Sequence, residues 1–234
     1  HAITTSEGII LIDSGYPDIV ETVTVPGLIE AGLDPADVKY VLLGHGHEDH
    51  YGGASYFQDH YGARIGTTAE DWDLIEKTAA SAGGDGPAPP TRDLVLSEGE
   101  PITLGDTTVT PVSIPGHTPG SLAYIFPVTD GGTPHVAGLF GGTILSMGRI
   151  TTPGLQQYVD SIEHFLEVAK QANVDVEVQN HAIFDNTPER LARLAARRAG
   201  DPHPFVMGTE RYVRFWNVIS ECMQAEIVRR GDAG

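Results

Sequence analysis

The hydrophobic and polar positions along the chain follow two patterns, one typical of buried strands and one typical of helices. Short apolar runs that end at glycine or polar residues predict strands at 7–15, 38–43, 63–67, 107–114, 122–128, 135–140 and 174–179. Apolar residues spaced three and four apart predict helices at 18–32, 54–62, 69–80, 155–169, 188–198 and 209–230. Strands that alternate with helices in this way favour an α/β fold.

No break in composition divides the 234 residues, so we predict a single domain over 1–234. The segment "SAGGDGPAPPT" (81–91) is rich in glycine and proline, but periodic structure resumes directly after it, which predicts a long loop rather than a linker. His1 is followed almost directly by a strand pattern. The numbered chain therefore either follows a removed leader or lacks a preceding strand. The protein would be periplasmic or secreted if a leader was removed, and cytoplasmic otherwise.

Charge and composition narrow the classes of partner. The chain has 14 Lys and Arg against 32 Asp and Glu, a formal charge of −18. This charge argues against nucleic acid and anionic membranes as partners and leaves a small-molecule substrate. No stretch approaches the roughly 20 apolar residues of a membrane helix. The single cysteine, Cys222, excludes an internal disulfide, and the oligomeric state cannot be read from the sequence.

The segment "GHGHEDHYGG" (44–53) follows a predicted strand and collects three histidines and an aspartate. Neutral imidazole is the commonest protein ligand of zinc, and carboxylates complete such sites. His45 and His47 are two residues apart and point the same way in an extended loop. Asp49 and His50 are adjacent and can face a second ion. A solvated polar loop is the alternative, but the density of ligand side chains favours a metal site.

Two further histidines, His117 in "PGHTPGS" and His181 in "NHA", also follow predicted strands. Loops at strand ends can meet at one edge of a layered α/β fold. We therefore predict two ligand sets, each holding one ion. The first ligand set is His45, His47 and His117, and the second ligand set is Asp49, His50 and His181. Two zinc ions about 3.5–4 Å apart activate a bridging water as a nucleophile at neutral pH.

The motifs "HGHEDHYGG", "PGHTPGS" and "NHA", in this order, resemble those of the metallo-β-lactamase superfamily, and the resemblance extends from "ILIDSG" to "DPHPFVMG". It implies a four-layer αββα sandwich, in which two central mixed sheets are flanked by helices and the metals lie at one edge. The chain is most similar to the third subclass of metallo-β-lactamases and related hydrolases. In that subclass one Asp and two His hold the second zinc, which Asp49, His50 and His181 match.

The same resemblance suggests roles for residues outside the two ligand sets. Asp13 in "LIDSG" would buttress the ligand loop, although a turn-forming aspartate is the simpler alternative. The loop 81–91 and Trp72 would cover the metals, although Trp72 also suits a helix anchor in the core. Thr143 and Arg149 follow "HVAGLF" and would meet a substrate anion, although Arg149 equally suits a surface salt bridge.

The chain departs from related families in ways that bear on its substrate and metal. Glyoxalase II, ribonuclease Z and the lactonases of the superfamily place a bridging aspartate where this chain has Gly141 and Gly142, which argues against those activities. The β-lactamases often have serine at this turn, whereas here Thr143 is the hydroxyl nearby. Flavodiiron oxidoreductases of the same fold place glutamate at the position of His47, so histidine there favours zinc over iron.

These observations predict a dizinc hydrolase that cleaves an amide or ester of a small molecule, with a β-lactam among the candidates. A metal-bridging hydroxide would attack the carbonyl, and Asp49 would orient that hydroxide as the catalytic residue. Three alternatives remain: a hydrolase of a non-β-lactam ester or lactone, an iron-containing oxidoreductase with the same ligands, and a non-catalytic metal-binding protein.

Overall fold

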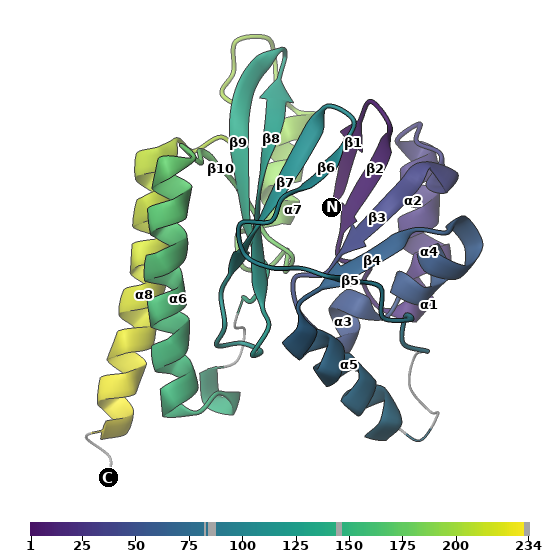
Figure 1. The fold of residues 1–234 in the computed structure, drawn as a ribbon. Coiled ribbons are helices and arrows are strands. Elements are labelled where there is room, and N and C mark those ends of the chain that lie inside the picture. The colour runs from purple at the N-terminus through teal and green to yellow at the C-terminus, as the bar shows by residue number, and fades with distance from the viewer. Residues whose placement is uncertain (82, 84–87, 144–146, 232–234) are drawn as a thin grey trace.

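Two five-stranded sheets lie face to face, with helices on both outer faces (Figure 1). The structure is a computed structural model that describes residues 1–81, 83, 88–143 and 147–231. The four layers confirm the αββα sandwich that the resemblance implied. In the described part of the chain, no helix is both long and apolar enough to span a bilayer.

The first sheet is built from the N-terminal part of the chain, in the order β1-β2-β3-β4-β5. Its strands are β1 (Ala2–Thr5), β2 (Gly8–Ile12), β3 (Val38–Leu42), β4 (Arg64–Thr67) and β5 (Leu94–Val95). β1 is antiparallel to β2, and the other pairs are parallel. The apolar run of β2 is buried on both faces, as is usual for a parallel strand inside a layered fold.

Most of the helices between these strands cover the outer face of the first sheet (Figure 1). They are α1 (Pro17–Ile19), the π-helical turn η1 (Val20–Thr24), α2 (Val25–Glu30), the 3-10 turn η2 (Pro35–Asp37), α3 (Glu48–Tyr51), α4 (Ala54–Tyr61) and α5 (Ala69–Ser81). Their buried side chains, among them Phe57 and Trp72, form one hydrophobic cluster with Ile65 and other residues of the sheet.

The second sheet is mostly antiparallel and has the order β10-β9-β8-β7-β6. Its strands are β6 (Ile102–Leu104), β7 (Thr107–Ser113), β8 (Leu122–Asp130), β9 (Thr133–Phe140) and β10 (Val176–Val178). The remaining helical elements are the 3-10 turn η3 (Met147–Arg149), α6 (Thr152–Gln171), α7 (Thr187–Ala195) and α8 (Thr209–Gly231). α6 and α8 pack on the outer face, where Phe165 and Trp216 contact Phe140.

A third hydrophobic cluster lies between the sheets and includes Ile10, Leu42, Tyr124 and Leu139. At one edge of the sandwich, backbone hydrogen bonds join the sheets directly. The Leu122 amide donates to the Gly44 carbonyl at 2.8 Å, and the Gly141 amide donates to the Leu122 carbonyl at 3.1 Å. This joint brings the loops that leave β2, β3, β7, β9 and β10 to one edge of the molecule.

The structure differs from the sequence predictions in three places. The helix predicted at 18–32 contains the π-helical turn η1, because Pro26 has no N–H for the regular hydrogen-bond ladder. Residues 48–51, predicted as loop, form the helical turn α3. β1, β5 and β6, which are two to four residues long, were not predicted.

Candidate metal centre

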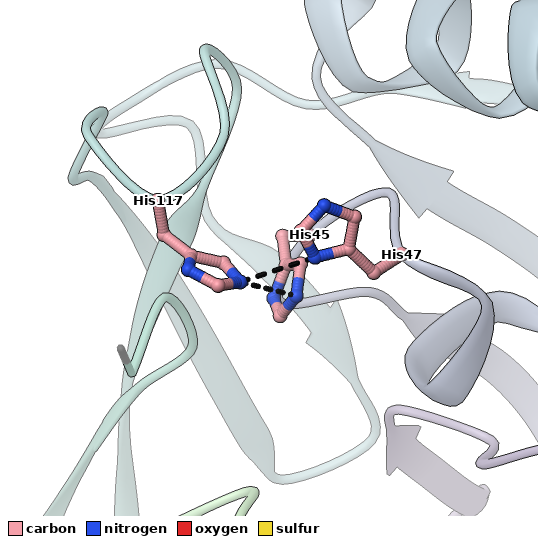
Figure 2. Close-up of side chains that lie close together, drawn as sticks. All are labelled: His45, His47 and His117. Atoms are coloured by element: carbon pink, nitrogen blue, oxygen red, sulfur yellow. Dashed lines mark hydrogen bonds between the residues drawn. The ribbon is translucent and has the colours of Figure 1, made fainter. Parts of the chain in front are cut away.

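The three histidines of the first ligand set point toward one another (Figure 2). His117 Nε2 lies 3.1 Å from His45 Nε2 and 3.1 Å from His47 Nδ1. His45 and His47 come from the loop after β3, and His117 comes from the loop after β7. The joint between the sheets therefore places three ring nitrogens from distant parts of the chain around one point.

The second ligand set lies beside the first. Asp49 and His50 stand on α3, with 3.4 Å between His50 Nε2 and Asp49 Oδ2. His181, from the loop after β10, places its Nε2 3.8 Å from the same oxygen. Ligand atoms of His45, Asp49 and His50 also lie within 4.8 Å of one another, so His45 stands between the two ligand sets. All six residues predicted as ligands are thus gathered at one edge of the sandwich.

Hydrogen bonds fix the orientation of two of these rings. His45 Nδ1 lies 2.7 Å from the Gly141 carbonyl, and His50 Nδ1 lies 2.7 Å from Asp13 Oδ2. Both acceptors require a proton on Nδ1, so Nε2 is the nitrogen of each ring that is available to a metal. Asp13 Oδ1 also accepts from the Gly44 amide at 2.7 Å. Asp13 therefore contacts both His50 and the backbone of the ligand loop, the buttressing position that the resemblance implied.

Asp71 is a site residue that the sequence analysis missed. It is buried on the first turn of α5, and its carboxylate accepts three hydrogen bonds. Oδ2 accepts from the Gly46 amide and the Thr118 hydroxyl, each at 2.7 Å, and Oδ1 accepts from the Gly120 amide at 2.9 Å. The donors belong to both loops that carry the first ligand set. No local pattern indicates such long-range partners, although an acidic residue in an apolar helix face was a visible signal.

The electrostatics of the site favour the protonation states that bind metals. Burial and the neighbouring imidazoles lower the pKa of His117 to about 3 and the pKa of His45 well below its usual range. Burial also lowers the pKa values of His47 and His181. Burial opposes ionisation of Asp49, but the contacts with His50 and His181 bring its pKa to about 2. Neutral imidazoles and an ionised carboxylate are the forms that ligate.

His50 is the exception, because two carboxylates face its ring. Burial lowers the pKa of His50, but the carboxylates of Asp13 and Asp49 raise it further, to about 10. This negative field, which favours a proton on the ring, equally favours a divalent cation at Nε2. That nitrogen is buried and has no hydrogen-bond partner in the described part of the structure.

The donor atoms fit zinc in type and spacing. Zn–N bonds of about 2.0–2.1 Å in a tetrahedral site place ligand nitrogens roughly 3.3–3.4 Å apart. The observed separations of 3.1 Å in the first ligand set are close to this value. Five imidazoles and one carboxylate are also a donor set that suits zinc.

The structure buries Trp72 and Thr143 instead of placing them over the metals or beside a substrate, and for Trp72 it agrees with the alternative of a helix anchor in the core. Trp72 is fully buried in the core beneath the first sheet, and its indole N–H donates to the Leu94 carbonyl at 2.8 Å. Thr143 is also fully buried, and its hydroxyl donates to Gln179 Oε1 at 2.5 Å. The family resemblance identified their positions in the chain, but packing decided which way their side chains face.

Arg149 lies on the 3-10 turn η3, is exposed, and forms no hydrogen bond or ion pair with the described residues. No contact links it to the six clustered residues. Part of the loop 81–91 lies outside the described residues, so the expectation that this loop covers the metals stays a prediction.

The model of the metallo-beta-lactamase superfamily matches residues 2–130 of the chain. A hydroxyacylglutathione hydrolase of Acidiphilium cryptum is 30% identical over 136 residues, which are 52% of this chain and 47% of that protein. The hydroxyacylglutathione hydrolase GloC of Haemophilus influenzae is 34% identical over 96 residues, 38% of this chain and 44% of that protein. The chain thus spans about half the length of the curated relatives it matches.

Solved structures resemble the chain over nearly its whole length. BJP-1, a subclass B3 metallo-beta-lactamase of Bradyrhizobium japonicum, aligns with a TM-score of 0.81 and 27% identity, covering 99% of this chain and 88% of that protein. FEZ-1 of Legionella gormanii aligns with a TM-score of 0.79 and 24% identity, covering 100% of this chain and 90% of that protein, and shows the same fold. Together with the match of the family model over more than half of the sequence, the fold establishes that the chain belongs to the metallo-β-lactamase superfamily.

Proposed function

We propose that this protein is a zinc-dependent hydrolase that uses two zinc ions to cleave an amide or ester bond of a small molecule. One observation carries the proposal: six donor residues from separate loops meet at one edge of the sandwich. Hydrogen bonds at Nδ1 orient the rings of His45 and His50, so that Nε2 is the nitrogen left to ligate once any proton on it is displaced. A polar surface loop would not need this arrangement.

When bound, a pair of zinc ions lowers the pKa of a coordinated water toward neutrality and polarises a carbonyl oxygen. The first ligand set would hold one ion and the second ligand set the other. Asp49 is ionised at neutral pH, because His50 and His181 bring its pKa to about 2 despite burial. Its carboxylate can accept a hydrogen bond from the attacking water and so orient that water. No other nucleophile is needed.

The space next to the second ligand set suits a small substrate. A cavity of about 560 Å³ reaches two of the proposed ligands: its lining includes Asp49 and His50, together with Asn180 and apolar residues such as Ile19 and Leu28. Such a volume is in the usual range for small-molecule sites. Because the chain carries a formal charge of −18, we propose no nucleic-acid or membrane partner.

A β-lactam is the first substrate that we propose. BJP-1, a subclass B3 metallo-beta-lactamase, aligns with nearly all of this chain. The turn after β9 supports the same choice. A side chain at Gly142 would start 3.4 Å from the His117 Cβ, so an aspartate there would stand directly beside the first ligand set. The bridging carboxylate of the glyoxalase II, ribonuclease Z and lactonase pattern is therefore missing where it would be needed.

A hydroxyacylglutathione thioester, the substrate of glyoxalase II, is the second candidate; the sequence matches favour it, and the missing aspartate at Gly142 counts against it. Several curated hydroxyacylglutathione hydrolases are 30% to 34% identical to this chain over 84 to 136 residues. These matches cover at most about half of either protein, so they support this substrate less than the fold supports a β-lactam. Iron in the same ligands is the alternative cofactor, and an imidazole at His47 rather than a carboxylate disfavours it.

Metal analysis combined with a substrate panel tests the proposal. Protein purified without added metal, and a zinc-reconstituted sample, would be analysed by mass spectrometry of the metals. Both would then be assayed with a chromogenic cephalosporin, an aryl ester, a lactone and a hydroxyacylglutathione thioester. We expect two zinc ions per chain and hydrolysis that a chelator abolishes and added zinc restores. Asp49→Asn should abolish turnover, and Asp73→Asn, on an exposed face of α5, should not.

Two results would contradict the proposal. Stoichiometric iron without zinc in the purified protein would favour the oxidoreductase alternative. Two bound zinc ions without hydrolysis of any compound in the panel would favour a non-catalytic metal-binding protein.

A further inference from the structure

The first turn of α5 contacts both loops that carry the first ligand set. Asp71 accepts hydrogen bonds from Gly46, which lies between His45 and His47, and from Thr118 and Gly120, which follow His117. Its two carboxylate oxygens therefore bridge two loops that lie about 70 residues apart in the sequence.

The backbone of both loops lies directly against this turn. A Cβ at Gly46 would lie 2.9 Å from the Asp71 carbonyl oxygen, and a Cβ at Gly120 would lie 2.8 Å from Asp71 Oδ1 and overlap the Thr68 hydroxyl. The Thr68 hydroxyl also donates to the Gly120 carbonyl at 2.9 Å. Glycine at both positions permits this close approach.

No cation of the described chain explains why an acidic residue occupies the position of Asp71. It is fully buried, and none of the described lysines or arginines forms an ion pair with it. Burying a carboxylate in this way is costly unless hydrogen bonds compensate, and here all three come from the ligand loops. An apolar residue could anchor the helix without this cost, so the carboxylate points to a role in holding the loops.

The second ligand set has different supports. Asp13 accepts from His50 Nδ1 and also from the Gly44 amide, which adjoins His45 of the first ligand set. No described hydrogen bond joins Asp71 to Asp49, His50 or His181. His50 of the second ligand set thus has a carboxylate partner of its own, the half-buried Asp13, whereas the Asp71 carboxylate bonds only the loops of the first ligand set among the described residues.

We propose that Asp71 is a positioning residue that sets the distance between His117 and the His45–His47 pair, and so controls metal affinity at the first ligand set selectively. This inference rests on the proposed function, because it takes the six residues to be metal ligands. Partners of metal ligands are typically worth about 10- to 100-fold in metal affinity. We expect Asp71→Asn to weaken one of two binding events by this factor, because the amide nitrogen replaces an acceptor with a donor.

Metal titrations of the full chain test the selectivity. Metal-free wild type, Asp71→Asn and the matched control Asp73→Asn would be titrated with zinc by calorimetry against a competing chelator. A parallel titration with cobalt(II) would follow the visible absorption of the two sites. Asp73 stands two residues further on α5, with its side chain 72% exposed, so its variant should titrate like the wild type. Asp13→Asn should weaken the other binding event.

A second variant and a background mutation keep the test informative if Asp71→Asn folds poorly. Thr118→Val removes one donor to Asp71 Oδ2 and leaves the carboxylate in place, so it should weaken the same event about threefold to tenfold. In a His117→Ala background, where the first ligand set is already broken, Asp71→Asn should no longer change the remaining event.

The outcomes separate this inference from the proposed function. If the wild type binds fewer than two zinc ions, the proposed function fails. If the wild type binds two and Asp71→Asn and Thr118→Val leave both events unchanged, or weaken both equally, only the positioning role of Asp71 is wrong. A shift confined to one event, absent in the His117→Ala background, supports it.

Discussion

The histidines of the site differ in what holds the nitrogen that faces away from the cluster. His45 and His50 have hydrogen-bond partners on Nδ1, whereas His117 Nδ1 is buried with no partner among the described residues. The His117 ring is therefore oriented by packing and by the loop that Thr118 anchors to Asp71. A metal on Nε2 would add the main directional contact of this ring.

Removing the His117 ring should therefore remove the first metal position. We expect His117→Ala to lower the zinc content from two to about one per chain and to reduce turnover by more than about 100-fold, because even indirect partners of ligands are worth 10- to 100-fold. His164→Ala is the matched control, since His164 lies on α6 and pairs with Glu98 at 2.6 Å. An unchanged content of two zinc ions in His117→Ala would show that the ligand assignment is wrong.

Glu177 on β10 is another buried carboxylate and should make stability depend on pH. Burial raises its pKa to about 8, although Gln179 and Trp216 donate hydrogen bonds to it. The folded state then holds a proton that the unfolded chain releases near pH 4.5. Stability therefore falls as the pH rises from about 4.5 to 8, by up to about 1.4 kcal/mol per pH unit.

Glu177→Gln should remove this dependence. We expect the variant to gain stability relative to the wild type at pH 8.5 and to match it more closely at pH 5, in urea unfolding followed by circular dichroism. The same difference at both pH values would mean that Glu177 is ionised in the folded state at neutral pH.

The sequence shows which residue types occur at which spacing, but it does not show which side chains contact one another. Five histidines and Asp49 at strand ends are the six residues that the structure gathers, and their role as metal ligands stays a prediction. Asp71 was missed because its three partners lie 25 to 49 positions away. Thr143 and Trp72 were assigned to the pocket because position alone does not say which way a side chain packs.

At the scale of elements, the site depends on the close approach of strand ends from both sheets. Gly141, directly after β9, lies against β8 and the loop after β3. A Cβ there would collide with the Leu122 carbonyl oxygen and lie 2.7 Å from the Gly44 Cα. Its own carbonyl accepts from both His45 and Asn180.

Gly141→Ala should therefore disturb both folding and the site. We expect a loss of about 1–3 kcal/mol in the free energy of unfolding, typical of overpacking, together with weaker zinc binding because His45 loses its aligned acceptor. Thermal unfolding and metal analysis would measure the two effects. Gly27→Ala is the control, since a Cβ at Gly27 meets nothing within 4 Å. If both variants unfold at the same temperature and bind the same amount of zinc, the backbone around Gly141 is not packed as closely as described.

Long elements with clear periodicity were predictable, and several of the short ones were not. One face of α6 carries Leu155, Ile162 and Phe165, and these side chains are buried, as their spacing predicted. The turn α3 escaped detection because four residues give no period, and its helical form separates Asp49 and His50 from the extended pair before them. The π-helical turn η1 likewise has no signature beyond Pro26.

For the whole molecule, bound metal should add stability, because the ligands come from both sheets. A ligand at 100 times its dissociation constant stabilises by about 2.7 kcal/mol, and each kcal/mol moves the Tm of a chain of this size by about 2–4 °C. We therefore expect a chelator to lower the Tm by about 5–10 °C and zinc to restore it. His117→Ala should show a smaller shift, and an equal Tm with and without chelator in the wild type would contradict this coupling.

The division of the ligands between the two sheets has a consequence for how the protein matures. If the six residues bind metal as proposed, each ligand set takes one histidine from the C-terminal sheet, His117 or His181, and the rest from the N-terminal one. When only the first sheet of a nascent chain has been synthesised, neither ligand set is complete. Zinc uptake would then come late in biogenesis, and the zinc content of a preparation would report how many of its molecules have assembled both halves.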